Sequence, residues 1–202
     1  MASRIIPPFP GDIDRDAFGH WLSGFCDGEA TFAIVKSAKR GRTRTDRGMM
    51  SYRAVFAIGL RDDDLDILRT VQSFLGCGYI QLLKNLRSKI PNAKPVARFR
   101  VDDQENAVGI IVPNFERYPL RAKKRQDFII WSEAARMLWE RKKRKTKTKI
   151  GRTGTLPKWS DAEHERFLLL WSSLREQREY RSAPIARGPV MRPPDPEQGH
   201  LF

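Results

Sequence analysis

The fold of this chain depends on one stretch, Trp21-Leu22-Ser23-Gly24-Phe25-Cys26-Asp27-Gly28-Glu29-Ala30. It is expected to end a helix that Asp14 or Asp16 caps, and a strand-like run over 31–36 follows it. Two carboxylates therefore stand at the C-terminal end of a helix, where the helix dipole repels negative charge. A divalent cation would remove this penalty by binding the Glu29 carboxylate and a carbonyl of the last turn, because those carbonyls lack helical partners.

The same stretch carries two glycines one helical turn apart. Gly24 and Gly28 lie on one face of the expected helix, with Ser23 beside them. Small residues at this spacing let a second backbone approach closely. The pattern therefore predicts that another helix packs against this face.

The composition favours a polyanionic partner. The chain has 202 residues, enough for one domain with its own core, and its 38 Lys and Arg against 24 Asp and Glu give a formal net charge of +14. Such an excess is typical of nucleic-acid binding first and of binding to an anionic membrane surface second. No apolar run reaches the length of a membrane span, so no membrane partner is expected.

The termini and the cysteines point to an intracellular protein. Pro7, Pro8 and Pro10 stand where a signal peptide would need an apolar stretch. Cys26 and Cys77 form neither a disulfide framework nor a zinc cluster, and they are interpreted as buried thiols in a reducing compartment. We expect the cytoplasm or nucleoid if the host is bacterial, and an organelle or the nucleus if it is eukaryotic.

The hydrophobic pattern along the chain predicts an α+β fold with a four-stranded antiparallel sheet, helices on one face and cations on the other. Strands are expected over 31–37, 50–60, 79–86 and 96–102, and helices over 62–75, 105–111, 121–140 and 161–180. Ser160 and Glu163 form a capping-box pattern before the last helix. We divide the chain into an irregular arm (1–13), a core (14–140), a basic linker (141–158), a C-terminal helix (159–181) and a disordered proline-rich tail (182–202).

Residues 22–30 resemble the LAGLIDADG motif of homing endonucleases. Leu22, Gly24 and Asp27 match it directly, and Ala30 replaces its last glycine. Three further stretches resemble the single-motif members of that family in the same order: 56–60 followed by acids, 74–80, and 115–128. The resemblance covers about residues 18–140, while the part after Gly151 is only loosely similar.

The resemblance implies that the concave face of the sheet binds DNA. Arg can read guanine, and Gln or Asn adenine, in the major groove, whereas the cations of the 39–47 segment would hold phosphates. The residues expected to contact DNA are Thr31, Val35, Ser37, Lys39, Arg40, Arg42, Arg44, Ser51, Arg53, Gln81, Asn85, Arg87, Arg98 and Arg100.

A single copy of the acidic motif implies a homodimer. The two motif helices would pack through residues Leu22, Ser23, Gly24 and Gly28, and this would bring two Glu29 carboxylates together at the symmetry axis. In this interpretation Mg2+ (or Mn2+) is held by the Glu29 side chain and the Gly28 carbonyl.

Three other residues are assigned to the active site by the resemblance. Lys123 matches the active-site lysine of the family, with Lys124 as the register alternative, and it would stabilise charge or order the attacking water. Asp27 belongs to the catalytic set, although a structural role in the motif turn suits it better. Ala57 occupies a sheet position where some members carry a polar, water-ordering residue. This departure puts the efficiency of catalysis in doubt, but it does not affect the expected metal site.

The implied function is a sequence-specific endonuclease that hydrolyses both strands of a long, near-palindromic DNA target. The alternatives are an RNA-binding maturase that assists intron splicing, and a DNA-binding regulator of the same fold that has lost cleavage. The gene would lie in an intron, in an intein or by itself. The basic run over 141–149 is interpreted as a helix extension on flanking phosphates, as a solvated linker, or as a nuclear address in a eukaryotic host.

Overall fold

The computed structural model describes residues 6–38, 50–83, 95–144 and 159–182. The strands are β1 (Ala30–Ala38), β2 (Met50–Arg61), β3 (Tyr79–Leu83) and β4 (Val96–Val101). The helical elements are α1 (Arg15–Glu29), η1 (Asp62–Asp64), α2 (Leu65–Leu75), α3 (Gln104–Asn106), η2 (Ala107–Ile111), α4 (Val112–Arg117), α5 (Lys124–Lys143) and α6 (Asp161–Ser182).

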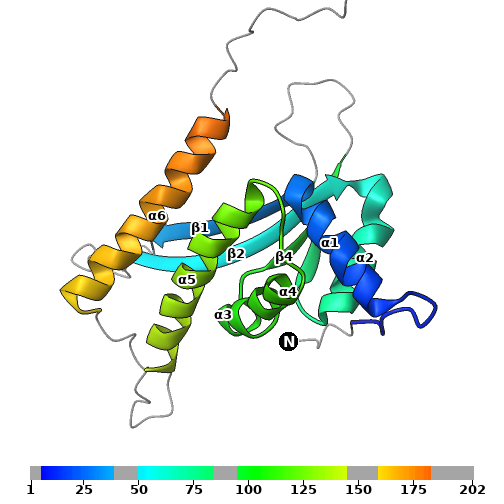
Figure 1. Cartoon of the computed structure of the whole chain (residues 1–202), viewed down its shortest axis with the longest axis horizontal. Coiled ribbons are helices and arrows are strands. Elements are labelled where there is room, and N and C mark those ends of the chain that lie inside the picture. The colour runs from blue at the N-terminus through cyan, green and yellow to red at the C-terminus, as the bar shows by residue number, and fades with distance from the viewer. Residues whose placement is uncertain (1–5, 39–49, 84–94, 145–158, 183–202) are drawn as a thin grey trace, which may run out of the picture.

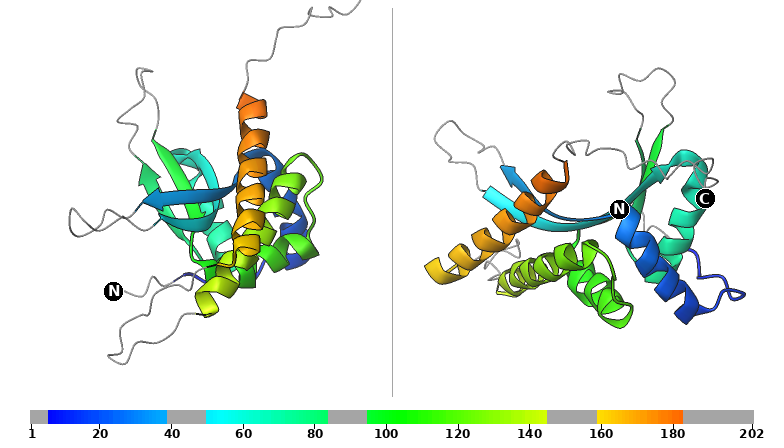
Figure 2. Two further views of the ribbon diagram at one scale, coloured as in Figure 1. Left: turned by 90° about the vertical axis from the view of Figure 1, so that its left-hand side faces the viewer. Right: turned by 45° about the horizontal axis from the view of Figure 1, so that its top comes forward.

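The four strands form one antiparallel sheet in the order β1-β2-β4-β3. The helices lie on one side of this bent sheet, and no helix of the described segments lies on the opposite side (Figure 1; Figure 2, right). This is the α+β arrangement that the sequence predicts. We call the side without helices the open face.

Alternation along the strands decides which side chains meet the helices. Phe32 of β1, Phe56 of β2 and Phe99 of β4 are fully buried and point toward α5, α4 and α2, where they belong to one core cluster with Trp131. The residues between them face the open side, as expected of strands with a period of two. A small separate cluster on that side consists of Ala33, Val55 and Ala57.

Helix ends follow the local signals in the sequence. The Asp14 carboxylate accepts from the Ala17 N–H at 2.6 Å at the start of α1. The Ser160 hydroxyl accepts from the Glu163 N–H at 3.2 Å and the Glu163 carboxylate from the Ser160 N–H at 2.9 Å, which confirms the predicted capping box before α6. α2 ends at Gly76, whose φ of 66° is in the left-handed region that glycine tolerates.

Two helices differ from the sequence prediction. α5 begins at Lys124 rather than at residue 121, because the N–H groups of Arg121 and Ala122 are bound by a distant carboxylate. It also continues to Lys143, beyond the expected end at residue 140. The predicted helix over 105–111 is a single turn, α3, followed by the π-helical η2.

α6 packs on α5 and on the end of the sheet formed by β1 and β2. Phe167 of α6 is fully buried, and its ring meets that of Tyr52 with a centroid separation of 4.9 Å. Within the described parts of the chain, no helix has the combination of length and apolar composition that a membrane crossing needs.

Candidate functional site

The motif helix α1 is clamped against the segment that precedes α5. The Tyr118 hydroxyl donates to Asp16 Oδ1 at 2.6 Å, and the Arg117 guanidinium donates to the same oxygen at 2.7 Å. The Tyr118 ring lies directly against Gly19, and the Ser23 hydroxyl donates to the Tyr118 carbonyl oxygen. These contacts join residues about 100 positions apart and hold α1 in one orientation.

Asp27 extends this clamp toward the end of the motif. Its Oδ2 accepts from the N–H of Arg121 at 2.8 Å and of Ala122 at 3.1 Å. Its other oxygen, Oδ1, is buried and has no hydrogen-bond partner among the described residues. Asp27 therefore acts as the cap of the turn that leads into α5, and Lys123 is the next residue along that turn.

Glu29 is the last residue of α1 and is exposed, as are Gly28 and Thr31. The Ala30 N–H donates to the Cys26 carbonyl, so the carbonyls of the later residues lie beyond the last helical hydrogen bond. Helix α1 passes into β1 without a loop. This places the acidic end of the motif directly at the edge of the open face.

One row of side chains runs across the open face from this point. In the sheet register Thr31 pairs with Ala57, Ala57 with Arg100, and Arg100 with Tyr79. The next row contains Gly59, Arg98 and Gln81. Ala57, the predicted departure from the family pattern, thus lies between the end of the motif and an arginine.

All eight predicted DNA-contacting residues that the structure describes occupy open-face positions of the strands. By register and parity these are Thr31, Val35, Ser37, Ser51, Arg53, Gln81, Arg98 and Arg100. Six others, Lys39, Arg40, Arg42, Arg44, Asn85 and Arg87, lie outside the described residues.

Sequence reasoning missed an acid on the open face. Asp102 Oδ2 accepts from Arg100 Nε at 3.2 Å and from the Tyr79 hydroxyl at 3.1 Å, and it lies 3.6 Å from Arg53 Nη1. Two arginines that the sequence treats as independent DNA contacts are therefore joined through one carboxylate. The signal was weak, because Asp102 follows the last residue of β4 and resembles an ordinary strand end.

The predicted set of dimer contacts on α1 requires a correction. Leu22 is fully buried and Ser23 is 4% exposed, so both belong to the core of this chain and neither lies on a surface that a partner could reach. Gly24 and Gly28 are exposed, and a Cβ at either position would meet nothing within 4 Å.

The exposed face of α1 includes two aromatic residues that the sequence prediction missed. Trp21 is 42% exposed, and its ring stacks on that of Phe25 with a centroid separation of 4.9 Å and an interplanar angle of 15°. Trp21, Gly24, Phe25 and Gly28 have the i, i+3, i+4, i+7 spacing of one helix face, which is the signal that could have found them.

The described cations of the basic run make contacts within the chain. Arg141 lies over the Trp159 ring at 4.5 Å from the centroid. Lys142 pairs with Asp103 at 3.1 Å. Lys143 and Arg144 pair with the nearby carboxylates of Glu140 and Glu163. The first part of this run is therefore a helix extension that ties α5 to α3 and α6.

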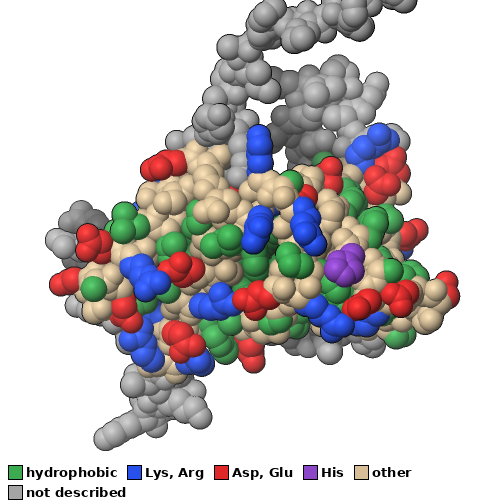
Figure 3. All heavy atoms as spheres, in the orientation of Figure 1, with side chains coloured by type: hydrophobic (Ala, Val, Ile, Leu, Met, Phe, Trp, Pro, Cys, Tyr) green, Lys and Arg blue, Asp and Glu red, His purple; other side chains and the backbone are tan. Residues whose placement is uncertain are grey.

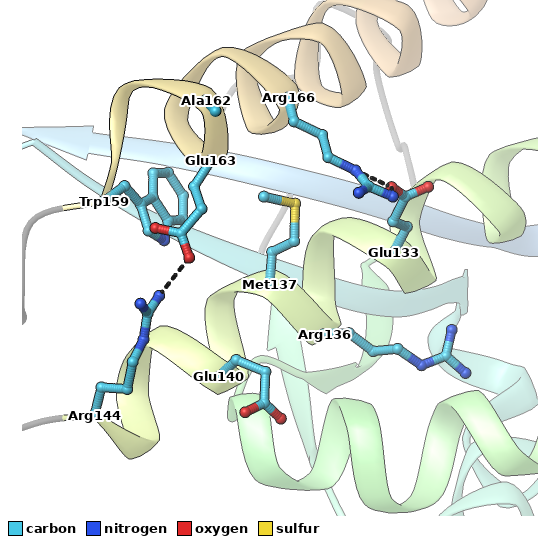
Figure 4. Close-up of a pocket in the computed structure, with 9 residues that line it drawn as sticks. All are labelled: Glu133, Arg136, Met137, Glu140, Arg144, Trp159, Ala162, Glu163 and Arg166. Atoms are coloured by element: carbon cyan, nitrogen blue, oxygen red, sulfur yellow. Dashed lines mark hydrogen bonds and ion pairs between the residues drawn. The ribbon is translucent and has the colours of Figure 1, made fainter.

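A groove of about 470 Å³ lies between α5 and α6 (Figure 4). Met137 and Trp159 give it an apolar lining, and the ion pairs Arg166–Glu133 and Arg144–Glu163 span the two helices. Acidic and basic side chains are intermixed over the helical side of the molecule (Figure 3). The groove is the seam where α6 docks, and it does not include the acidic motif.

Residues 22–135 match the family described as LAGLIDADG endonuclease. The probable intron-encoded endonucleases 2 and 3 of Neurospora crassa are each 28% identical, over 130 and 120 residues. These matches cover 64% and 58% of this chain but 23% and 20% of the relatives, so the chain spans about a quarter or less of their length.

Solved structures share the fold. I-SmaMI bound to cleaved DNA superposes with a TM-score of 0.58 at 20% identity, over 85% of this chain and 48% of that one. The homing endonuclease I-TnaI superposes with a TM-score of 0.54 at 21% identity, over 84% of this chain and 98% of that one. Because the family match covers more than half of the sequence, from the motif helix into α5, the chain belongs to the LAGLIDADG endonuclease family.

Proposed function

We propose that the protein is a site-specific, metal-dependent endonuclease that cuts both strands of a DNA duplex as a homodimer. The observation that carries this proposal is the position of Glu29: it is exposed at the end of α1, where the motif meets a sheet face that presents Arg53, Arg98 and Arg100. The Neurospora relatives are named as intron-encoded endonucleases, and I-SmaMI and I-LtrWI are described in complexes with DNA, which supports the same function here.

The donor atoms at the motif end suit a hard divalent cation. A carboxylate and a backbone carbonyl are oxygen donors of the kind that Mg2+ and Ca2+ prefer, and one I-SmaMI complex is described with calcium ions. Glu29 and the Gly28 carbonyl would hold the ion. Within the described residues there is no group of three or more metal-ligating side chains, so other ligands would come from DNA and from a second copy of the chain.

When bound, the metal would supply activation of water and stabilisation of the leaving oxygen during phosphodiester hydrolysis. The chain itself contributes a fixed negative charge at Glu29 and a positive charge at Lys123. Asp27 holds the two N–H groups just before Lys123, and this orders the turn that carries the lysine. Lys123 would stabilise developing charge or order the attacking water.

The exposed face of α1 supports the homodimer. Gly24 and Gly28 leave room for the backbone of a second α1, and the stacked Trp21 and Phe25 rings flank that space. A symmetric contact of this kind brings two copies of Glu29 near the axis. The superposition on about half of I-SmaMI and on nearly all of I-TnaI is consistent with a unit that works in pairs.

The proposal is tested with a library of randomised duplexes, incubated with the protein and Mg2+ and sequenced at the broken ends. We expect cleavage of both strands at one related set of sequences, and the variant Glu29→Gln should bind these sequences without cutting them. Cutting by Glu29→Gln at the full rate would remove Glu29 from the reaction. Sequence-specific binding to RNA alone, with no dependence of DNA breaks on Glu29, would favour the maturase alternative instead.

The division of labour between the two chains can be tested with a covalently linked mixed dimer that carries one Glu29→Gln substitution. Each Glu29 is proposed to serve mainly one scissile phosphate, so a supercoiled target plasmid should be nicked quickly and linearised slowly. Rapid linearisation would show that one Glu29 is sufficient for both strands.

A further inference from the structure

Asp102 places a negative charge on the face of the sheet that is proposed to bind DNA. Its side chain is 22% exposed, and it lies among Arg53, Arg100 and Tyr79. A carboxylate repels phosphates, so its presence there weakens binding to any duplex. It therefore needs a compensating role, and its contacts indicate which one.

The backbone of Asp102 is held in place on both sides of the residue. Before it, β4 pairs with β2 up to Val101. Beyond that point the Gln104 amide takes the place of a strand: its Oε1 accepts from the Ala54 N–H at 3.4 Å, and its Nε2 donates to the carbonyl oxygens of Ala54 and Asp102, both at 3.3 Å. Gln104 is 8% exposed, and its two bonds to Ala54 are buried.

The residue after Asp102 is held as well. The Asp103 carboxylate caps α3 by accepting from the N–H groups of Glu105 at 3.0 Å and Asn106 at 3.1 Å, and it also pairs with Lys142 of α5. Asp102 consequently cannot drift with a flexible loop. The backbone that carries its carboxylate is therefore held in one place on the open face.

The hydrogen bond to Arg100 leaves one edge of the guanidinium available. An arginine presents five N–H donors in a planar fork, and Asp102 binds at Nε. Among the described residues no hydrogen bond engages the two terminal nitrogens of Arg100, and their outward N–H groups are the pair that can bind O6 and N7 of a guanine. The Arg100 side chain is only 21% exposed, so its orientation is also restricted by its neighbours.

From this arrangement we propose that Asp102 is a positioning residue for sequence recognition: it fixes the guanidinium of Arg100 so that the outer edge reads one guanine in each half of the DNA target. The inference rests on the proposed function of the open face as a DNA-binding surface. In this proposal Asp102 lowers the affinity for DNA in general but increases the discrimination between base sequences.

Tyr79 supports the same arrangement from β3. Its hydroxyl donates to the oxygen that Arg100 also uses, and burial, followed by the negative charge of Asp102, raises the pKa of the phenol. Tyr79 thus remains a hydrogen-bond donor at neutral pH. With one carboxylate bound by Tyr79 and Arg100, rotation of Asp102 would cost two hydrogen bonds at once.

The experiment compares the base preferences of four full-length proteins by sequencing duplexes selected from a random library in Ca2+: wild type, Asp102→Asn, Arg100→Lys and the double variant. We expect the preference for guanine at one position per half-site to fall about tenfold in Asp102→Asn, the order of one well-oriented bidentate contact. Arg100→Lys should lose preference at the same position, because lysine lacks the fork. The double variant should lose no more than either single variant.

A second readout separates positioning from a general loss of structure. Removing one negative charge should strengthen binding to unrelated DNA and steepen the slope of log K against log salt by up to about 0.9 per chain. The matched control is Asp66→Asn on α2, where the side chain is 92% exposed and pairs with Arg69 of the same helix. This control should change neither base preference nor salt slope.

The outcomes are distinguishable from failure of the proposed function. If wild type selects sequences and Asp102→Asn keeps the same preference, the inference is wrong while the function stands. If wild type selects no sequence at all, the proposed function fails. If Asp102→Asn does not fold, the base preferences of wild type and Arg100→Lys still test the inference. A guanine preference that Arg100→Lys leaves unchanged would overturn it.

Discussion

Replacing Gly19 by alanine is expected to loosen the clamp on the motif helix. A Cβ at Gly19 would lie 2.5 Å from Tyr118 Cζ and 2.7 Å from Tyr118 Cδ2, closer than real contacts allow. The ring cannot simply rotate away, because it is 5% exposed and its hydroxyl is bound to Asp16 at 2.6 Å. Either α1 shifts outward or the Tyr118–Asp16 hydrogen bond breaks.

The magnitude follows from these contacts. Overpacking of a tight core contact costs about 1–3 kcal/mol. Loss of a hydrogen bond to a charged group adds about 1.5–3 kcal/mol when it occurs. Alanine recovers about 1 kcal/mol over glycine through its helix propensity. A net destabilisation of about 2 kcal/mol results, and for a chain of this size this lowers Tm by about 4–8 °C.

Gly24→Ala is the matched control, since it makes the same change in the same helix. A Cβ at Gly24 meets nothing within 4 Å, so only the propensity gain remains, and Tm should rise by about 2–4 °C. Thermal unfolding of both variants is measured where Tm does not depend on protein concentration, because dimerisation would otherwise contribute. Equal shifts in the two variants would refute the steric reasoning.

Three further predictions concern the motif, the dimer and the thiols. Asp27→Asn should lower stability by about 1 kcal/mol and slow cleavage, because the turn before α5 loses a charged acceptor. An Asp27→Asn protein that cuts at the wild-type rate would contradict the positioning role. Glu29→Gln should abolish cleavage without lowering Tm, because it removes a negative charge that the C-terminal end of α1 repels. Trp21→Ala should shift the complex on DNA from two chains toward one, as measured by the mass of the complex; an undiminished two-chain complex would exclude Trp21 from the interface. Burial raises the pKa of Cys77 to about 12 and that of Cys26 further, so neither thiol should react with iodoacetamide at pH 8 until the chain unfolds, and rapid labelling of the native protein would contradict this burial.

Local patterns in the sequence were sufficient for much of the fold. The alternation in β1, β2 and β4, the capping box at Ser160 and the left-handed glycine after α2 each depend on residues within four positions of one another. Backbone geometry links such spacings directly to a strand face or a helix end. The acidic motif belongs to this class as well, because its residues are consecutive in the sequence.

Contacts between distant segments needed the tertiary structure. The sequence places Leu22 and Ser23 beside the glycines, but only packing against residues near Tyr118 shows that both are buried within the chain. The tertiary structure likewise shows that Trp21 is exposed and stacks on the half-buried Phe25. Helical periodicity shows which residues share a face of α1. Which of these faces is exposed depends on the segments that pack against the helix.

The same limit applies to the two acids with structural roles. Asp27 binds N–H groups 94 and 95 residues away, and Asp102 meets Arg53 and Tyr79 across strands whose order is β1-β2-β4-β3. The contacts of Asp102 depend on strand order and register, and neither can be read from the residue spacing within a single segment. Residue type and local spacing therefore decided the elements and the motif, whereas the partners of each charged side chain were decided by the packing of the sheet and its helices.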